Sequence, residues 1–376
     1  RLCSGGTAWL AVVMFLASGL VMRLAMQADI DLGVCFYSIL ALLAFVRWTE
    51  EEKTQSIVLC SVFVGLALGS KYIALISVWA PILLVTLLYA PRGKRVIGLF
   101  WMLALPILVM APCLLRNWLM VENPVFPLLY SWLGGEGWTP AANEFFKAAH
   151  SPKSMPLGGH LFAFIRSPFD LTILKTTVFS PLILFGIVLI PTRRTKGRPI
   201  YLLSLYSLVA FALWFILTQR NDRFLVTIVP TLSILAALGL NAHTDWLRNA
   251  IRWPVWIVAY TALFTLLVTV SFQNGLRYLC GTETANNYYE RVLPHMRAVH
   301  FLNEQSREQS IRVMFVGEAQ AYASKFNAIV PVVFNPHPWL KHNTHGEVIP
   351  ISPEEAAKRL RDLGQYEGCR RGNKNC

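Results

Sequence analysis

Two carboxylates separated by one residue, Asp29 and Asp31, stand between long apolar runs in a chain that otherwise contains little charge. A carboxylate in a membrane helix is unfavourable by roughly 2.5–3.5 kcal/mol at the helix centre, and by less at its end. At the mouth of a cavity, such a pair could bind a divalent metal, orient a hydroxyl group or support a general base. The alternative is a solvated helix N-terminus, because Asp caps helices well and interacts favourably with the helix dipole.

Three basic residues offer the complementary chemistry. Lys71 lies between two apolar runs, and Arg220 and Arg223 lead into another run at Phe224. Guanidinium groups form forked hydrogen bonds to phosphate oxygens, so these cations could hold a phosphate or an anionic headgroup. The alternatives are snorkelling of Lys71 to the membrane interface, contact of the arginines with anionic lipid, and pairing with Asp222.

The composition indicates a polytopic membrane protein. Of the 376 residues, 55% are hydrophobic and only 15% are charged, and the mean hydropathy is +0.48. The net charge of +13 does not predict nucleic-acid binding, because the basic residues lie in short loops and not in a stripe interleaved with exposed aromatic residues. The spacing of the seven cysteines matches no metal site.

We expect about nine membrane-spanning helices to position these charged residues. The expected spans are residues 7–25, 32–48, 55–69, 72–90, 96–114, 178–191, 200–217, 224–242 and 254–272. Several exceed ~17 residues, which is enough to cross the hydrocarbon core, whereas 55–69 and 178–191 are short.

The loops between these spans predict the orientation of the chain. One set of loops carries twelve basic residues, whereas the opposite short loops carry only Lys71, Arg220 and Arg223. By the positive-inside rule the first set is cytoplasmic, which also places the N-terminus inside. Asp29, Asp31 and the three cations, together with the C-terminal segment, then share the extracytoplasmic side.

The composition changes near residue 276, where a small extracytoplasmic α/β domain is expected. Strands are predicted at 311–317 and 328–334 and helices at 318–325 and 353–363, with Ser352 as N-cap and Glu355 in a capping box. We therefore assign residues 1–275 to a transmembrane module, 276–364 to the α/β domain and 365–376 to a disordered tail. Within the module, residues 115–177 form a long extracytoplasmic loop.

This long loop is expected to carry two amphipathic helices in the membrane interface. They cover residues 141–149 and 160–166, and Phe145, Phe146, Phe162 and Phe164 would face lipid.

Several segments resemble the polytopic glycosyltransferases of the GT-C class, in particular the family of protein O-mannosyltransferases and the aminoarabinose transferase of lipid A. The segments are Ala28–Phe36 (ADIDLGVCF), Val64–Leu75 (VGLALGSKYIAL), Arg116–Pro127 (RNWLMVENPVFP), Arg223–Leu240 and Phe315–Tyr322 (FVGEAQAY). The resemblance covers most of residues 8–364, and the order of the motifs makes it specific.

The resemblance implies an enzyme of the bacterial inner membrane that moves a sugar from a polyprenyl-phosphate donor to an extracytoplasmic lipid, glycan or protein acceptor. It implies no definite cofactor, although a divalent metal could bind at the site. Asp31, supported by Asp29, would lie near the acceptor or the metal. The residues expected to bind substrate are Lys71, Tyr72, Arg116, Asn117, Arg220 and Arg223.

In that family the principal catalytic carboxylate lies in the first extracytoplasmic loop. By resemblance this chain begins at the family's third helix, so we expect two helices and that loop upstream of Arg1, and the C-terminal pattern departs after Gly364. The alternative interpretation is a transporter or flippase for a lipid-linked substrate, in which the same charges line a path. A third is a non-catalytic membrane scaffold.

Overall fold

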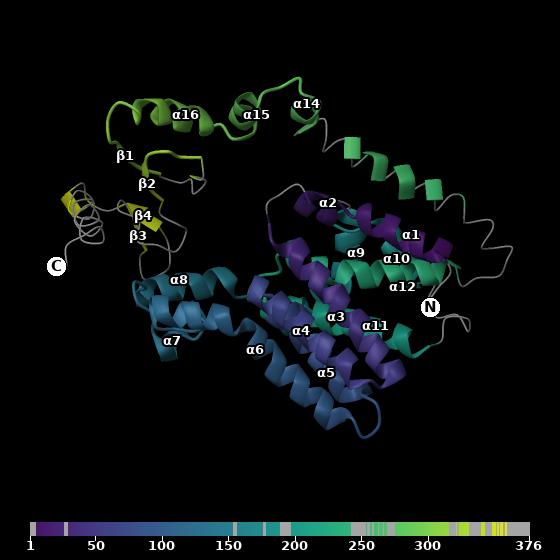
Figure 1. Cartoon of the computed structure of the whole chain (residues 1–376). Coiled ribbons are helices and arrows are strands. Elements are labelled where there is room, and N and C mark those ends of the chain that lie inside the picture. Colours follow the sequence, from purple (N-terminus) through teal and green to yellow (C-terminus); the bar gives the residue numbers. More distant parts are fainter. Residues whose placement is uncertain are drawn as a thin grey trace. The chain divides into compact units, whose positions relative to one another are not determined.

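The computed structural model is mainly helical and divides into two compact units (Figure 1). The first unit comprises Arg1–Arg116 and Ser151–Gln273, and the second comprises Asn117–His150 and Asn274–Cys376. The residues that the structure describes are 5–25, 29–152, 156–175, 178–188, 197–241, 253, 256–257, 259–261, 263–265, 267–268, 275–315, 321, 323–330, 340–342, 348–350, 352, 354–355 and 358.

Four helical segments are long and apolar enough to cross a membrane. They are α3 (Asp31–Glu51), α6 (Arg95–Val121), α11 (Arg198–Leu217) and the segment Asp222–Asn241, which joins the 3-10 helix η3 (Asp222–Ile228) to α12 (Val229–Asn241). A fifth results if α1 (Gly5–Leu16) and α2 (Gly19–Ala25), which are bent by 67°, form one span. The chain is therefore an integral membrane protein.

The remaining predicted spans correspond to shorter helices. They are α4 (Thr54–Ser70), the π-helix η1 (Leu75–Trp79) with α5 (Ala80–Tyr89), and α10 (Pro181–Val188). Most of the predicted span 254–272 lies outside the described residues. Nine membrane crossings therefore remain a prediction.

The described part of the chain has three irregular helices, η1, η3 and the π-helix η2 (Asp170–Leu174). Buried hydroxyl and thiol groups hold η1 and η3 against their neighbours. The Tyr206 hydroxyl of α11 donates to the carbonyl of Ser77 in η1 at 2.9 Å and lies 2.9 Å from Ser38 Oγ of α3. The Cys35 thiol of α3 donates to the carbonyl of Val226 in η3 at 3.2 Å. Since lipid offers no hydrogen bonds, irregular backbone in a membrane protein needs such partners from within the protein.

Basic side chains bind the helix ends at the turn where α3 meets α4. Arg198 at the start of α11 donates to the carbonyls of Thr49 in α3 and Tyr89 in α5. Lys94 donates to the carbonyl of Glu52, which forms the α3–α4 turn with φ of 56°. Cations at helix C-termini satisfy free carbonyls and interact favourably with the helix dipole. These contacts fix one end of the α3–α4 hairpin.

Helix α6 extends further than the sequence predicted. Its last residue is Val121, whereas the long loop was expected to begin at residue 115. The helix ends where Glu122 adopts a left-handed φ of 59° and Pro124 follows. Arg116 and Asn117 are therefore helical, and the prediction that they open a loop was wrong.

The two helices predicted within the long loop are present as α8 (Pro140–His150) and α9 (Leu157–Phe169). Phe164 of α9 was expected to face lipid. It packs instead on Phe211 and Phe215 of α11, with ring centroids 5.4 and 5.3 Å apart. The expectation failed because the apolar side of α9 has aromatic partners on α11.

The C-terminal part of the second unit contains short elements. The helices are α14 (Leu276–Leu279), α15 (Ala285–Val292) and α16 (Met296–Gln305). Strands β1 (Arg312–Met314) and β2 (Asn327–Ile329) pair in parallel, and β3 (Leu340–His342) and β4 (Val348–Pro350) pair antiparallel. The predicted helices 318–325 and 353–363 lie largely outside the described residues, although the amide of Glu355 donates to Ser352 Oγ at 3.2 Å as a cap requires. The proposed domain boundaries remain a prediction.

Close packing of α10 on α12 predicts a strong effect of one glycine. A Cβ at Gly186 would lie 2.5 Å from the Ala236 carbonyl oxygen, so Gly186→Ala should separate the two helices. We expect a lower midpoint of thermal unfolding in detergent. Gly158→Ala on α9, where a Cβ would meet nothing within 4 Å, is the control and should be neutral or stabilising. Equal midpoints for the two variants would contradict the packing.

Candidate functional site

The α3–α4 hairpin brings Asp31 and Lys71 to the same place. Asp31 is the first residue of α3, and Lys71 directly follows the last residue of α4. The helices have 21 and 17 residues, or about 31 and 26 Å, and are joined by a short turn. Because the helices are antiparallel, the start of α3 and the end of α4 meet at the end opposite the turn.

Asp31 and Lys71 form an ion pair inside the protein. Lys71 Nζ donates to both carboxylate oxygens of Asp31, at 2.9 and 2.8 Å. The side chain of Asp31 is 2% exposed and that of Lys71 is 25% exposed. A buried carboxylate needs such a partner, because removing one member of a buried pair leaves an uncompensated charge.

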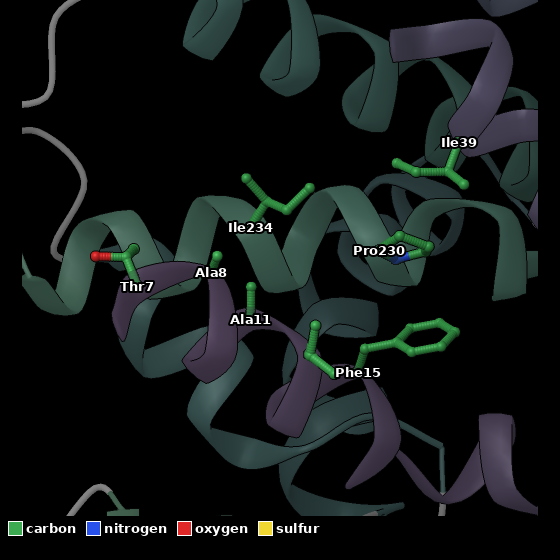
Figure 2. A pocket seen from close by; sticks show the side chains of 8 residues that line it. Thr7, Ala8, Ala11, Phe15, Ile39, Pro230 and Ile234 are labelled. Atoms are coloured by element: carbon green, nitrogen blue, oxygen red, sulfur yellow. The ribbon is translucent and has the colours of Figure 1, made fainter. Parts of the chain in front are cut away.

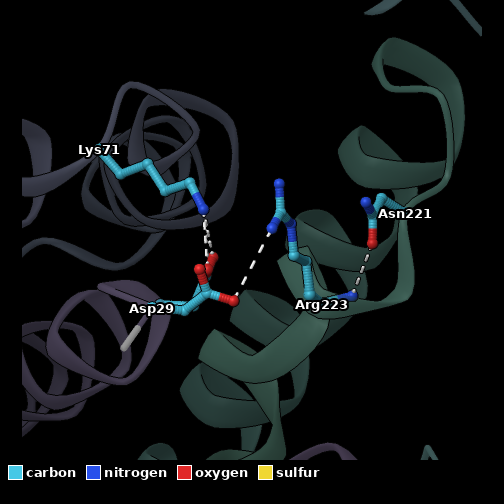
Figure 3. A network of polar contacts seen from close by, with 5 residues as sticks. Asp29, Lys71, Asn221 and Arg223 are labelled. Carbon is cyan, nitrogen blue, oxygen red and sulfur yellow. Dashed lines mark hydrogen bonds and ion pairs between the residues drawn. The ribbon is translucent and has the colours of Figure 1, made fainter. Parts of the chain in front are cut away.

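A second, looser pair lies beside the first. Arg223 of η3 approaches Asp29, with 3.9 Å between Nη1 and Oδ2, and the side chains are 39% and 37% exposed (Figure 3). Asn221 accepts a hydrogen bond from the amide of Arg223 at 3.2 Å and so fixes the start of η3. The buried Nε of Arg223 has no hydrogen-bond partner among the described residues.

The ring of Phe224 connects the two cations. Lys71 Nζ lies 5.5 Å from its centroid and the Arg223 guanidinium carbon lies 5.4 Å from it. Both are within the range of cation–π interaction. Sequence reasoning assigned no role to Phe224 or Asn221, and only their proximity to Arg223 along the chain could have indicated one.

The structure does not bring Arg220 into this cluster. Arg220 has a left-handed φ of 61°, its guanidinium lies 3.9 Å from the centroid of the Phe215 ring, and its Nε donates to the Phe215 carbonyl. Its Nη2 lies 3.0 Å from His160 Nδ1 of α9. The turn before η3 therefore directs the two arginines to different partners.

The other predicted substrate-binding residues have separate surroundings. Tyr72, next to Lys71, is half-buried and packs against the apolar core. Arg116 is exposed on α6, and Asn117 Nδ2 donates to the carbonyl of Pro124 at 3.3 Å. Their roles in binding remain a prediction.

Of the two clustered carboxylates, Asp29 is the one more open to a metal ion. Within the described part of the chain, no three or more His, Cys, Asp or Glu residues form a group that could hold a metal ion. Both oxygens of Asp31 already accept hydrogen bonds from Lys71. Asp29 is the more exposed of the two carboxylates, so it is the one that a metal or a hydroxyl group could reach.

An apolar groove of about 340 Å³ lies between α1, α3 and α12 (Figure 2). Its lining includes Ala11 and Phe15 from α1, Ile39 from α3, and Pro230 and Ile234 from α12. Ile39 follows Asp31 by eight residues, or about 12 Å along α3. The groove and the charged cluster thus both involve α3 and the segment Asp222–Asn241, which carries Arg223 in η3 and the groove residues in α12.

No protein-family model matches the chain, and neither does any curated protein sequence. Among solved structures, the chain is similar to the crystal structure of ArnT from Cupriavidus metallidurans bound to undecaprenyl phosphate. The sequence identity is 13% and the TM-score is 0.43, and the match covers 80% of this chain and 53% of that chain. The chain thus spans about half the length of ArnT.

The burial of Asp31 predicts that Lys71→Met will strongly destabilise the protein. The substitution leaves a buried carboxylate without its cation, so the free energy of unfolding in detergent should fall by about 3 kcal/mol. The double variant Asp31→Asn with Lys71→Met should recover most of this loss. Asp29→Asn is the matched control and should change stability by less than about 1 kcal/mol, since its ion pair is solvated. A double variant as unstable as Lys71→Met alone would contradict the assignment.

Proposed function

We propose that this chain is a membrane module of a glycosyltransferase that takes a sugar from a polyprenyl-phosphate donor and passes it to an extracytoplasmic acceptor. The observation that carries the proposal is the cluster of Asp29, Asp31, Lys71 and Arg223 at one end of apolar helices. A lipid-linked donor requires cations at the level of its phosphate, and an attacking hydroxyl group requires a carboxylate. The motif resemblance to the GT-C class supports the same reading.

The two cations are suited to bind the leaving phosphate. Lys71 has three N–H donors, of which Asp31 accepts two, so one remains for a phosphate oxygen. The buried Nε of Arg223 has no hydrogen-bond partner in the described part of the chain, and an anionic ligand near η3 could satisfy this costly donor. Arg220 is assigned no contact with the phosphate, since it contacts Phe215 and His160.

The two carboxylates then have different tasks. Asp31 orients Lys71, because both of its oxygens accept hydrogen bonds from that residue. Asp29 is the exposed carboxylate, and it supports the attacking hydroxyl group or binds a divalent metal. The sequence suggested that Asp31 is the carboxylate near the acceptor or metal, with Asp29 in support, whereas this proposal gives the leading role to Asp29.

The reaction is a direct displacement at the anomeric carbon. The acceptor oxygen forms a bond to that carbon while the bond from the carbon to the phosphate oxygen breaks, and the configuration inverts. The phosphate leaves with the bonding electron pair beside Lys71 and Arg223. The proton of the acceptor hydroxyl passes to a carboxylate.

Binding of a long-chain polyprenyl monophosphate to the purified protein tests the proposal. Arg223→Gln should weaken binding by about 10- to 100-fold, which corresponds to the loss of a charged hydrogen bond worth about 1.5–3 kcal/mol. In the protein that includes the loop expected upstream of Arg1, sugar transfer from the corresponding polyprenyl-phosphate sugar should fall with it. Binding is measured by the ligand-dependent shift in thermal unfolding, and transfer by release of polyprenyl phosphate.

Arg92→Gln is the matched control, because Arg92 is an exposed cation in the connection 90–94 between α5 and α6, near the opposite end of the helices. Its effect on both readouts should be negligible. Equal losses for the two variants would contradict a specific phosphate site. Movement of an intact lipid-linked sugar across a vesicle membrane, without release of polyprenyl phosphate, would favour the transporter.

We also propose that the charged cluster lies on the extracytoplasmic side and the α3–α4 turn on the cytoplasmic side. The basic residues Lys94 and Arg198 at the turn support this orientation. A membrane-impermeant thiol reagent applied outside intact cells should label Gln219→Cys, which precedes the cluster, but not Lys53→Cys in the turn. The reverse pattern would overturn the orientation, and labelling of both positions would overturn the spanning hairpin.

A further inference from the structure

Residues 122–150 form a compact segment that encloses several of its own aromatic side chains. The ring of Phe126 makes an edge-on contact with that of Trp138, with centroids 5.3 Å apart, and Trp138 makes another with Phe146. The hydroxyl of Tyr130 donates to the Trp138 carbonyl at 2.9 Å. The segment therefore has an interior of its own in which large side chains are packed.

A fully buried asparagine fixes the backbone of this segment. The side-chain amide of Asn123 donates to the carbonyls of Leu128 and Gly134, at 3.0 and 2.9 Å. Its side-chain oxygen accepts a hydrogen bond from the amide of Val125. These bonds hold the two ends of the connection that contains α7 (Tyr130–Leu133), so the outward direction of the α7 side chains is built into the fold.

Despite this interior, the segment exposes one of its two tryptophans. Trp132 of α7 is 85% exposed, and Leu129 and Leu133 beside it are about half exposed. The last turns of α6 add a second exposed group. We define the 118–133 apolar surface as Trp118, Leu119, Met120, Leu129, Trp132 and Leu133. Six large apolar side chains exposed within residues 118–133 indicate a contact with a membrane or a partner.

The length of α6 indicates which contact applies. Its 27 residues extend about 40 Å, whereas the hydrocarbon core is about 30 Å thick. Twenty residues counted from Val96 reach Leu115, so Arg116 marks the edge of the core and Trp118 enters the headgroup layer. The segment stays beside this end of α6, because the amide of Glu136 donates to the Val121 carbonyl at 3.0 Å.

The residue types fit this location. Trp is enriched at membrane–water interfaces, and Lys and Arg near helix ends extend toward the headgroups. Arg116 is exposed, two residues before Trp118. Lys147 Nζ lies 3.1 Å from the Ser131 hydroxyl but is paired with Glu144 at 2.9 Å, so Arg116 is the cation that faces no carboxylate in the same segment of α6. Exposed apolar side chains that follow an exposed arginine are complementary to a bilayer that contains anionic lipid.

We propose that the 118–133 apolar surface inserts into the interfacial layer of the membrane, with Trp132 as its deepest exposed side chain. The partner is lipid, at the boundary between headgroups and acyl chains. The surface anchors the end of α6 at a fixed depth. The inference does not depend on sugar transfer, and it concerns residues outside the charged cluster.

Site-directed spin labelling in vesicles of phosphatidylethanolamine and phosphatidylglycerol tests the proposal. A nitroxide is attached at Trp132→Cys in the full chain, with the seven native cysteines replaced by alanine or serine. We expect high collision with lipid-soluble oxygen and low collision with a water-soluble nickel chelate, corresponding to a depth of about 5–10 Å below the headgroups. Because Trp132 is so exposed, its replacement leaves the packed interior intact.

The control nitroxide is placed at Glu308→Cys, an exposed position after α16, and should collide mainly with the nickel chelate. The same aqueous signature at position 132 would overturn the proposal. Low collision with both reagents at position 132 would also overturn it, because it would indicate a protein partner or a second copy of the chain.

Discussion

The first unit depends on the buried ion pair between Asp31 and Lys71. A carboxylate that is 2% exposed cannot remain charged in an apolar bundle without a partner, and the α3–α4 hairpin supplies that partner. The hairpin does so only while its other end is held, which Arg198 and Lys94 achieve by binding the carbonyls of Thr49 and Glu52. The Asp31–Lys71 pair can therefore form only if α3 and α4 are antiparallel, have matching lengths and are held together at the turn.

The same constraint explains why the cluster is surrounded by irregular backbone. A continuous helix satisfies its own hydrogen bonds but directs side chains only to its flank. Lys71 occupies the extended break between α4 and η1, and Arg223 occupies the 3-10 helix η3. These irregular segments direct the side chains of Lys71 and Arg223 toward the same place. They are tolerated because Tyr206 and Cys35 donate hydrogen bonds to carbonyls of η1 and η3. The buried hydroxyls thus belong to the architecture of the site.

Sequence patterns could predict the proximity of Asp31 and Lys71, because two consecutive spans with a basic turn must return the chain to the same side. They could not predict the surroundings of Arg220, whose left-handed backbone directs it to Phe215 and His160. They also placed the end of α6 too early, since hydropathy falls at Arg116 while the helix continues to Val121. Backbone conformation and aromatic partners decide these details, and neither has a periodic signature in the sequence.

The four charged residues form two ion pairs that differ in burial. The Asp31–Lys71 pair is the more buried and holds the helix ends together, whereas the Asp29–Arg223 pair is accessible to a ligand. Two well-formed hydrogen bonds link Asp31 to Lys71, and the Asp31 side chain is almost completely buried, so a substrate has little access to its carboxylate. Asp29 and Arg223 are more exposed and are separated by 3.9 Å, a distance at which each can exchange its partner at little cost. Under the proposed function, an incoming phosphate would compete with Asp29 for Arg223, and a hydroxyl group or metal would compete with Arg223 for Asp29. Binding of a phosphate donor to Arg223 would then release Asp29, while the buried pair with Asp31 keeps Lys71 in place. This order, with the donor bound before Asp29 becomes available, follows from the burial of the four residues and could not be inferred from their positions in the sequence.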